Sequence, residues 1–313
     1  MKSIADGVWP TMITPFQEDG SIDYQTLEKL VDWYVERGVA GLFAVCQSSE
    51  MFFLSLKERL ALSRACVKAA RGRVPVIASG HVAETLEDQV EEARLMADTG
   101  VQAVVLLVNR FARYNEGDDV FRRSLDRFLS LMPADILLGF YECPAPYKRL
   151  LSPALMKFCV ESGRFGFLKD TCCRTDDIAA KLAIAKGSNF KLFNANAATL
   201  LDSLKAGAAG YSGVMTNFHP DLYSWLCANW AADPERAREL QDFLGLASVI
   251  ESQYYPVNAM YALSLEGVPC GLVSRRADPS RFSPSMKLEV EQLMRISRSY
   301  SARFRQGAAG GMK

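Results

Sequence analysis

The strongest constraint on the fold is an alternation of short apolar segments with longer charged segments, repeated eight times along the chain. The apolar segments are rich in β-branched and aromatic residues. They lie at residues 7–14, 40–46, 74–79, 101–108, 136–141, 165–169, 191–194 and 210–214. Such segments, when longer helical stretches separate them, are typical of repeated βα units and a parallel sheet.

The segments between these strands have the period of amphipathic helices. Within 23–37 the apolar residues recur at the spacing of one helix face, namely Leu27, Leu30, Val31 and Tyr34. Residues 55–71 and 84–98 repeat that pattern. Eight such units ending near residue 233 predict an α/β protein with a (β/α)8 barrel over 1–233. A doubly wound sheet is disfavoured because the chain has no G-x-G-x-x-G or G-K-[ST] phosphate loop.

The chain continues beyond the barrel with helical patterns at 233–252, 256–266 and 284–305. We therefore expect a helical C-terminal extension over 234–306. The last residues, 307–313, are mostly Gly and Ala, which offer little surface to bury, so we expect a frayed tail.

Charge and hydropathy exclude several kinds of partner. The 36 Lys and Arg residues balance 36 Asp and Glu residues, so no basic excess is available for nucleic-acid phosphates or a membrane surface. The apolar run 101–108 is far shorter than the roughly 18 residues that span a bilayer. Asp6 interrupts the N-terminus where a secretory signal would be apolar. We expect a cytoplasmic protein with a small-molecule partner.

Cysteine and histidine usage predicts no metal centre. The eight cysteines include no C-x-x-C pair, so we expect reduced and mostly buried thiols. His81 and His219 are the only histidines and lie far apart in the sequence, so we expect structural roles for both. A serine triad is disfavoured because no G-x-S-x-G elbow is present.

In a (β/α)8 barrel the chemistry lies at the carboxyl ends of the strands. Polar residues lie at the carboxyl ends of three of the predicted strands, at 46–50, 140–144 and 166–171. Lys169 is the most informative of them, since it ends an apolar strand. Desolvation there lowers the pKa of its amine and makes a nucleophile available that can form an imine with a keto group. An ion pair with Asp170, or a lysine that reaches solvent, remains the alternative.

Two other strand ends carry groups that complement a lysine nucleophile. Tyr141 can both donate and accept a proton, although a buried structural tyrosine fits the same pattern. Ser48 and Ser49, with their backbone N–H groups, can bind a carboxylate in a polar turn. An ordinary loop is the alternative for these serines.

These segments together resemble the dihydrodipicolinate synthase and N-acetylneuraminate lyase superfamily of class I aldolases, which are (β/α)8 barrels. The similarity covers most of the chain. The matching segments are Thr14-Pro15-Phe16, the 41–50 loop, Tyr141-x-x-Pro144, the 166–171 lysine segment and Gly207-x-x-Gly210-x-Ser212-Gly213.

The resemblance implies that Lys169 forms the imine, that Tyr141 relays protons, and that Ser48 and Ser49 contact the carboxylate of a 2-oxo acid. The imine nitrogen then acts as the electron sink, so no metal or organic cofactor is implied. Pyruvate is implied as product or donor and an aldehyde as the other partner. The family is commonly tetrameric, so the resemblance also implies a homo-oligomer, a tetramer or a dimer.

Departures from the family bear on the substrate. The 46–50 loop reads Cys-Gln-Ser-Ser-Glu where the family has Gly-Thr-Thr-Gly-Glu. Asn109-Arg110-Phe111 stands where dihydrodipicolinate synthases have Pro-Tyr-Tyr, and residues 145–147 replace their arginine. Residues 195–198 lack the acids that sialic acid lyases use for sugar hydroxyls. These differences argue against both name-giving activities.

We therefore expect a lyase, aldolase or dehydratase acting on a 2-oxo acid such as a 2-oxo-3-deoxy sugar acid. Beyond the residues above, the expected substrate contacts are Thr171, Ser212 and Gly213, with Arg110, Glu142 and Asn196 more distal. One alternative is a hydratase-aldolase on aromatic pyruvate adducts, which Phe111 and Phe140 would suit. The other is a barrel that binds a keto acid without catalysis.

Overall fold

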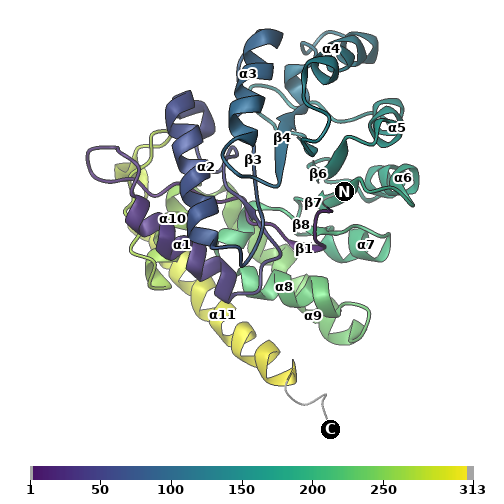
Figure 1. Ribbon diagram of the computed structural model, residues 1–313. Helices are drawn as coiled ribbons and strands as arrows, with labels where there is room; N and C mark the ends of the chain where they lie inside the picture. Colours follow the sequence, from purple (N-terminus) through teal and green to yellow (C-terminus); the bar gives the residue numbers. More distant parts are fainter. Residues whose placement is uncertain (1–2, 309–313) are drawn as a thin grey trace.

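The structure is a computed structural model that describes residues 3–308. Eight parallel strands form a single curled sheet surrounded by helices (Figure 1), which confirms the predicted (β/α)8 architecture. The strands are β1 (Gly7–Val8), β2 (Leu42–Phe43), β3 (Val76–Ala78), β4 (Ala103–Leu107), β5 (Leu138–Tyr141), β6 (Phe165–Asp170), β7 (Lys191–Asn194) and β8 (Gly210–Tyr211). They are ordered β1-β8-β7-β6-β5-β4-β3-β2.

The barrel closes through a short junction between the two strands at the ends of this order. Thr11 and Phe43 form a parallel bridge beyond β1, and the amide of Met12 donates to the Phe43 carbonyl at 3.1 Å. The predicted first strand, 7–14, is regular only at its start, because Pro10 has no N–H to donate to a ladder. A few hydrogen bonds therefore complete the ring.

Eight helices follow the strands and cover the outside of the barrel. They are α1 (Tyr24–Glu36), α2 (Leu56–Ala70), α3 (Leu86–Ala97), α4 (Asp118–Leu131), α5 (Pro153–Ser162), α6 (Thr175–Ala185), α7 (Leu200–Lys205) and α8 (Pro220–Asn229). Side-chain caps start several of them. Ser55 and Glu58 form a capping box at α2, and Thr85 caps α3.

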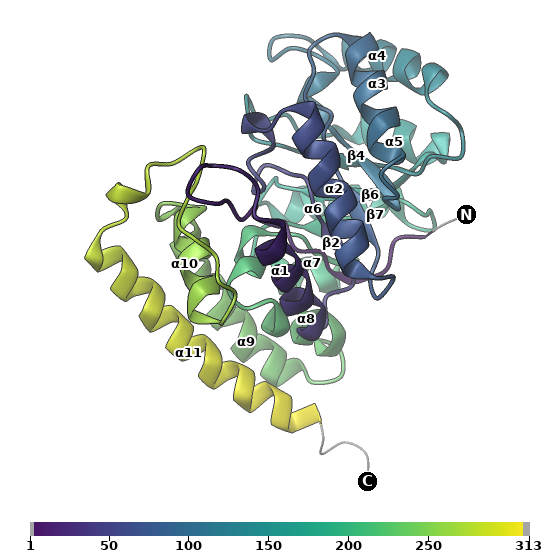
Figure 2. The same cartoon turned by 60° about the vertical axis from the view of Figure 1, so that its left-hand side comes forward.

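The C-terminal part is helical, as predicted. It contains α9 (Pro234–Ala247), the 3₁₀ turn Ser248–Ser252, α10 (Val257–Leu265) and α11 (Pro284–Ala308). The long helix α11 packs against α8 and α10 along one side of the barrel (Figure 2). It includes Gly307 and Ala308, two positions of the tail expected to fray. The rest of that tail, 309–313, lies outside the described residues.

Aromatic rings fill the barrel beneath its mouth. Trp9 packs edge-on against Phe167 and Phe193 at centroid distances of 5.9 and 6.1 Å, and Phe43 packs edge-on against Phe167 at 5.9 Å. All four rings are fully buried. The ring of Tyr141 meets Phe43 at 6.0 Å, so the aromatic layer forms an apolar floor under the strand ends.

Both histidines are buried and hydrogen-bonded, in agreement with structural roles. Burial lowers the pKa of His81 to about 3 and that of His219 to about 4. His81 accepts a hydrogen bond from the Leu107 amide at Nδ1 (3.2 Å), and His219 bonds Ser297 (3.0 Å). All eight cysteines are free thiols and six of them are buried.

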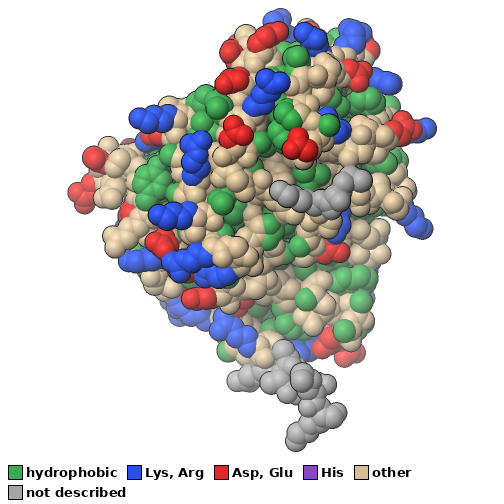
Figure 3. Space-filling view, viewed as in Figure 1, with side chains coloured by type: hydrophobic (Ala, Val, Ile, Leu, Met, Phe, Trp, Pro, Cys, Tyr) green, Lys and Arg blue, Asp and Glu red, His purple; other side chains and the backbone are tan. Residues whose placement is uncertain are grey.

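The surface carries charges of both signs, and Figure 3 shows basic and acidic side chains interspersed over the face it presents. Over residues 3–308, no helix combines the length and the apolarity that crossing a membrane requires.

The contact between β1 and β8 predicts a sharp difference between two glycine substitutions. A Cβ at Gly210 would lie 1.9 Å from the Gly7 carbonyl oxygen, whereas a Cβ at Gly187 would meet nothing within 4 Å. We expect Gly187→Ala to cost about 1–2 kcal/mol, because its φ is +79°. Gly210→Ala should cost about 3 kcal/mol or more, since it separates β1 from β8. Urea unfolding of both variants measures this, and equal losses would contradict the close contact between β1 and β8.

Candidate active site

A cavity of about 360 Å³ opens at the carboxyl ends of the strands. Six of the residues predicted for the site line it, namely Lys169, Tyr141, Ser48, Thr171, Asn196 and Gly213. Four others, Ser49, Ser212, Glu142 and Arg110, do not. This is the face of a (β/α)8 barrel at which catalytic groups are found.

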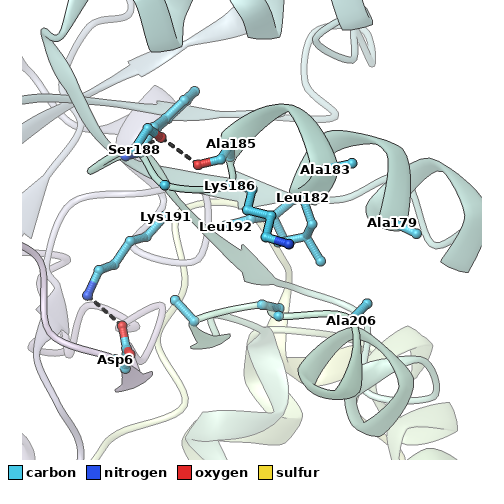
Figure 4. A pocket seen from close by; sticks show the side chains of 15 residues that line it. Asp6, Ala179, Leu182, Ala183, Ala185, Lys186, Ser188, Lys191, Leu192 and Ala206 are labelled. Carbon is cyan, nitrogen blue, oxygen red and sulfur yellow. Dashed lines mark hydrogen bonds and ion pairs between the residues drawn. The ribbon is translucent and has the colours of Figure 1, made fainter.

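A larger cavity of about 550 Å³ lies at the opposite end of the barrel (Figure 4). Small residues of α6 and of the segments that precede β7 and β8 form most of its lining. Its charged groups include Lys191 and Asp6, which pair with each other at 2.6 Å. The cavity with Lys169 is therefore the candidate active site, since it alone of the two combines a buried lysine with a tyrosine.

Lys169 occupies the next-to-last position of β6 and is only 3% exposed. Its Nζ lies 4.4 Å from the centroid of the Tyr141 ring. Burial lowers the pKa of this amine, which increases its neutral, nucleophilic fraction. The alternative of an ion pair with Asp170 does not hold, because Asp170 pairs with Lys181 at 2.5 Å.

Tyr141 ends β5, and the parallel ladder places it directly beside Lys169. Its hydroxyl donates a hydrogen bond to Oε1 of Gln47 at 3.3 Å. Burial raises the pKa of Tyr141 well above its ordinary value, so the resting side chain is a neutral phenol. The pair thus combines an amine nucleophile with a proton donor.

The two serines of the 46–50 loop have different environments. Ser48 lines the cavity, next to the Tyr255 hydroxyl. The Ser49 hydroxyl is fully buried, 2.8 Å from the Met12 carbonyl and 2.7 Å from that of Ala44. The expected contact of Ser49 with substrate is therefore corrected: its side chain satisfies buried backbone groups and fastens the loop to the barrel.

Ser212 and Gly213, which follow β8, also have different environments. Gly213 lines the cavity, whereas the Ser212 hydroxyl is buried and donates to the Trp9 carbonyl at 2.9 Å. The expected substrate contact of Ser212 is thus also corrected, because its hydroxyl joins β8 to the segment after β1.

Glu142 is the clearest correction to the expected site. Its carboxylate is completely buried outside the cavity and binds Lys181 Nζ at 2.5 Å, as Asp170 also does. Neighbouring residues of a strand point to opposite faces, so Glu142 and Asp170 face α6 while Tyr141 and Lys169 face the barrel mouth. We call these three charged residues, Glu142, Asp170 and Lys181, the β5–β6 clamp.

The clamp carries one more negative than positive charge when fully ionised. Burial, followed by repulsion from Asp170, raises the pKa of Glu142 to about 7. The Glu142 carboxylate also accepts the amides of Leu151 (2.9 Å) and Thr171 (3.0 Å). Sequence reasoning missed Lys181, although a lysine on the buried face of α6, beside Ile178 and Leu182, signals a buried partner.

The aromatic residues that favoured an aromatic substrate lie away from the cavity. Phe111 stacks on His81 at 5.2 Å, and Phe140 stacks on Phe165 at 4.6 Å. Both pack against Phe121 of the outer helix α4, at centroid distances of 5.3 and 6.1 Å.

The C-terminal part contributes several residues that the sequence did not identify. Glu251, Ser252, Tyr255 and Arg276 line the cavity. Burial raises the pKa of Glu251, and the charge of Lys169 opposes this shift. No local motif marks these residues, since only the packing of the extension over the barrel mouth brings them to the site. Within residues 3–308 no group of three or more His, Cys, Asp or Glu side chains is placed to hold a metal ion.

A buried lysine beside a neutral phenol, at the mouth of a (β/α)8 barrel, is an arrangement suited to a class I enzyme, one that acts through a lysine imine. The family model described as the dihydrodipicolinate synthetase family matches residues 5–295. The chain belongs to this family, and it is an enzyme of the class I lyase type.

Two curated relatives carry the same name, 4-hydroxy-tetrahydrodipicolinate synthase. The protein from Saccharophagus degradans is 29% identical over 93% of this chain and 98% of its own length. The protein from Laribacter hongkongensis is 28% identical over 91% of this chain and 96% of its own length.

Solved structures share the fold. The dihydrodipicolinate synthase of Bacillus anthracis aligns with a TM-score of 0.84 at 20% identity, covering 94% of this chain and 99% of that one. The Acinetobacter baumannii enzyme, solved in complex with pyruvate, aligns with a TM-score of 0.83 at 21% identity, covering 93% and 98%.

Removal of the clamp cation should destabilise the protein in a pH-dependent way. We expect Lys181→Met to lower the free energy of unfolding by about 3–5 kcal/mol at pH 8, since it leaves buried carboxylates without a cation. Glu142 has a raised pKa, so the folded state binds its proton more tightly than the unfolded state, and stability falls as pH rises through about 7. Without Lys181 this fall should extend to higher pH, because loss of the cation raises the pKa of Glu142 further.

Urea unfolding at pH values from about 5 to about 8, the range in which Glu142 titrates, measures the effect. Lys186→Met, at an exposed lysine that follows α6, is the matched control and should be neutral. The double variant Glu142→Gln with Lys181→Met should recover part of the loss. A loss that does not change with pH would contradict the clamp.

Proposed function

We propose that the protein is a lyase or aldolase in which Lys169 forms an imine with a 2-oxo acid, with pyruvate as product or donor. The observation that carries the proposal is the position of the Lys169 amine. It is buried in the cavity, has a lowered pKa, and lies 4.4 Å from the ring of Tyr141. The family of the chain and the pyruvate complex of the Acinetobacter relative support it.

The chemistry follows from these two side chains. The neutral amine of Lys169 attacks the 2-oxo carbon, and the carbinolamine loses water to give a protonated imine. The imine nitrogen accepts the electron pair released when the C3–C4 bond of the substrate breaks, while the C4 hydroxyl gives up its proton and C4 departs as an aldehyde, which leaves an enamine. Protonation of the enamine and hydrolysis then release pyruvate and restore the amine.

Tyr141 is suited to move the protons of these steps. Because its raised pKa keeps it protonated, it first donates to the departing hydroxyl of the carbinolamine. The cationic imine close to its ring then stabilises the phenolate, which can accept the proton of a substrate hydroxyl. Gln47, which accepts the Tyr141 hydrogen bond, fixes the orientation of the phenol.

The lining of the cavity fits a hydroxylated substrate. Ser48, Thr171 and Asn196 bring hydroxyl and amide groups around Lys169, and Ser252 adds another hydroxyl. We therefore propose a 2-oxo-3-deoxy sugar acid or a similar 2-oxo acid, cleaved or dehydrated, with Ser48 as a contact for its carboxylate. Phe111 and Phe140 lie outside the cavity and give no support to an aromatic substrate. A cytoplasmic homo-oligomer stays a prediction, which sedimentation and fractionation can check.

Borohydride trapping tests the nucleophile. Incubation with pyruvate and borohydride should add one reduced pyruvate to Lys169, detected by intact and peptide mass, because reduction makes the imine irreversible. Lys169→Arg should abolish the adduct, whereas Lys157→Arg, an exposed control on α5, should retain it. An adduct on Lys148, the other lysine of the cavity, would overturn the assignment. Keto-acid binding without any adduct would favour a non-catalytic barrel.

A second experiment separates the roles of Lys169 and Tyr141. The enamine exchanges the methyl hydrogens of pyruvate with solvent, so NMR in D₂O follows turnover without knowledge of the aldehyde partner. We expect Tyr141→Phe to slow this exchange by about 10²–10⁴-fold while borohydride still traps the imine. Tyr114→Phe, at a 79% exposed tyrosine, should exchange at the normal rate. Unchanged exchange in Tyr141→Phe would exclude the phenol as the proton relay.

A further inference from the structure

A second cavity of about 310 Å³ adjoins the one that contains Lys169. Gln47 and Arg276 line both cavities, so the two are contiguous. We call the second one the distal cavity; its other main lining residues are Glu50, Phe52, Phe53, Arg110 and Pro146. The proposed reaction at Lys169 does not account for these groups.

Two guanidinium groups of the distal cavity form no ion pair, although the charge of Arg276 acts on Glu50, whose pKa burial raises. Arg149 and Arg275 nearby pair with carboxylates at 3.1 and 2.6 Å, but neither Arg110 nor Arg276 forms an ion pair within residues 3–308. Arg110 is half-buried, and its Nε is buried without a hydrogen-bond partner among the described residues. Guanidinium groups left unpaired in a cavity favour a carboxylate or phosphate between their donors.

Glu50 gives the cavity a second unsatisfied group. It is 2% exposed, and Oε2 accepts the Arg276 amide at 2.8 Å and the Ser274 hydroxyl at 3.1 Å. Oε1 has no partner among the described residues. The φ of Glu50 is +59°, a left-handed conformation that costs energy in a non-glycine residue, so these contacts hold it in place.

A series of side-chain contacts leads from Lys169 to the distal cavity. Lys169 contacts the Tyr141 ring, the Tyr141 hydroxyl bonds Gln47 at 3.3 Å, and Gln47 also lines the distal cavity. A substrate held as an imine at Lys169 can therefore extend past Gln47 toward Arg110. The rings of Phe52 and Phe53 and the side chain of Pro146 provide walls for its carbon chain.

We propose that the distal cavity binds an oxyanion at the far end of the substrate, between Arg110 and Arg276. The substrate class is then a 2-oxo acid with a second carboxylate or a phosphate at the opposite end of its chain. Oε1 of Glu50 accepts a hydrogen bond from a hydroxyl of that chain. This inference rests on the proposed imine chemistry at Lys169 and specifies the substrate of the same site.

The test compares acids that differ only at the far end, by the concentration that gives half-maximal borohydride trapping at Lys169. The matched pair is 2-oxoadipate and 2-oxohexanoate, with 2-oxoglutarate and 2-oxopimelate as length variants. A phosphorylated 2-oxo-3-deoxy sugar acid and its unphosphorylated form distinguish phosphate from carboxylate. We expect the acid with the more tightly bound oxyanion, carboxylate or phosphate, to reach half-maximal trapping at about tenfold lower concentration than the matched acid with an uncharged far end.

Arg110→Met and Arg276→Met should each remove most of that preference, because the far-end oxyanion then loses one of its two guanidinium partners. Arg110→Lys, which keeps the charge, should retain part of it. Arg123→Met is the matched control, at a 70% exposed arginine on α4, and should behave as the unmodified protein does. Thermal unfolding of each variant confirms that the comparison is made on folded protein.

The outcomes separate this inference from the proposed function. If both members of each pair trap equally well, the oxyanion site is refuted while the imine chemistry stands. The oxyanion site is also refuted if 4-phenyl-2-oxobutanoate, whose far end is an uncharged aromatic ring, traps better than the diacids. It is refuted as well if the arginine variants keep the preference. If neither these acids nor pyruvate trap on folded protein, the proposed function fails and this inference fails with it.

Discussion

The structure depends on the parallel pairing of β5 with β6 and on the charged contacts behind it. The ladder sets Tyr141 beside Lys169, and the next residue of each strand, Glu142 or Asp170, binds Lys181 on the opposite face. The β5–β6 clamp therefore holds the two strand ends that carry Tyr141 and Lys169. A buried clamp with excess negative charge is costly, but its directional hydrogen bonds fix the register of the ends.

The aromatic layer inside the barrel gives the same strand ends their chemical character. Trp9, Phe43, Phe167 and Phe193 exclude water from beneath the mouth, so the Lys169 amine is desolvated and its pKa is lowered. The same burial raises the pKa of Tyr141. One apolar environment thus yields a neutral amine and a neutral phenol, because burial disfavours the charged form of each group.

Sequence reasoning located the site better than it assigned the individual side chains. Lys169 and Tyr141 were identifiable because each lies at the carboxyl end of an apolar strand, in a barrel whose chemistry lies at strand ends. The wrong assignments fall on residues that are adjacent in sequence to a residue of the cavity lining. Ser49, Ser212 and Glu142 each follow or precede a cavity residue by one position, and that single position turns the side chain away from the cavity. Strand bounds read from composition are too uncertain to settle such a one-residue difference.

The sequence by itself determined the number and order of the βα units, the helical C-terminal part and the segments that carry the lysine and the tyrosine, because these depend on local periodicity and chain order. Only the tertiary structure decided which groups meet. Glu251, Tyr255 and Arg276 reach the mouth because the C-terminal part packs over it, and Arg110 faces a cavity that it shares with Arg276 from the distant end of the chain. Such contacts join residues far apart in sequence, and no local pattern encodes the distance between them.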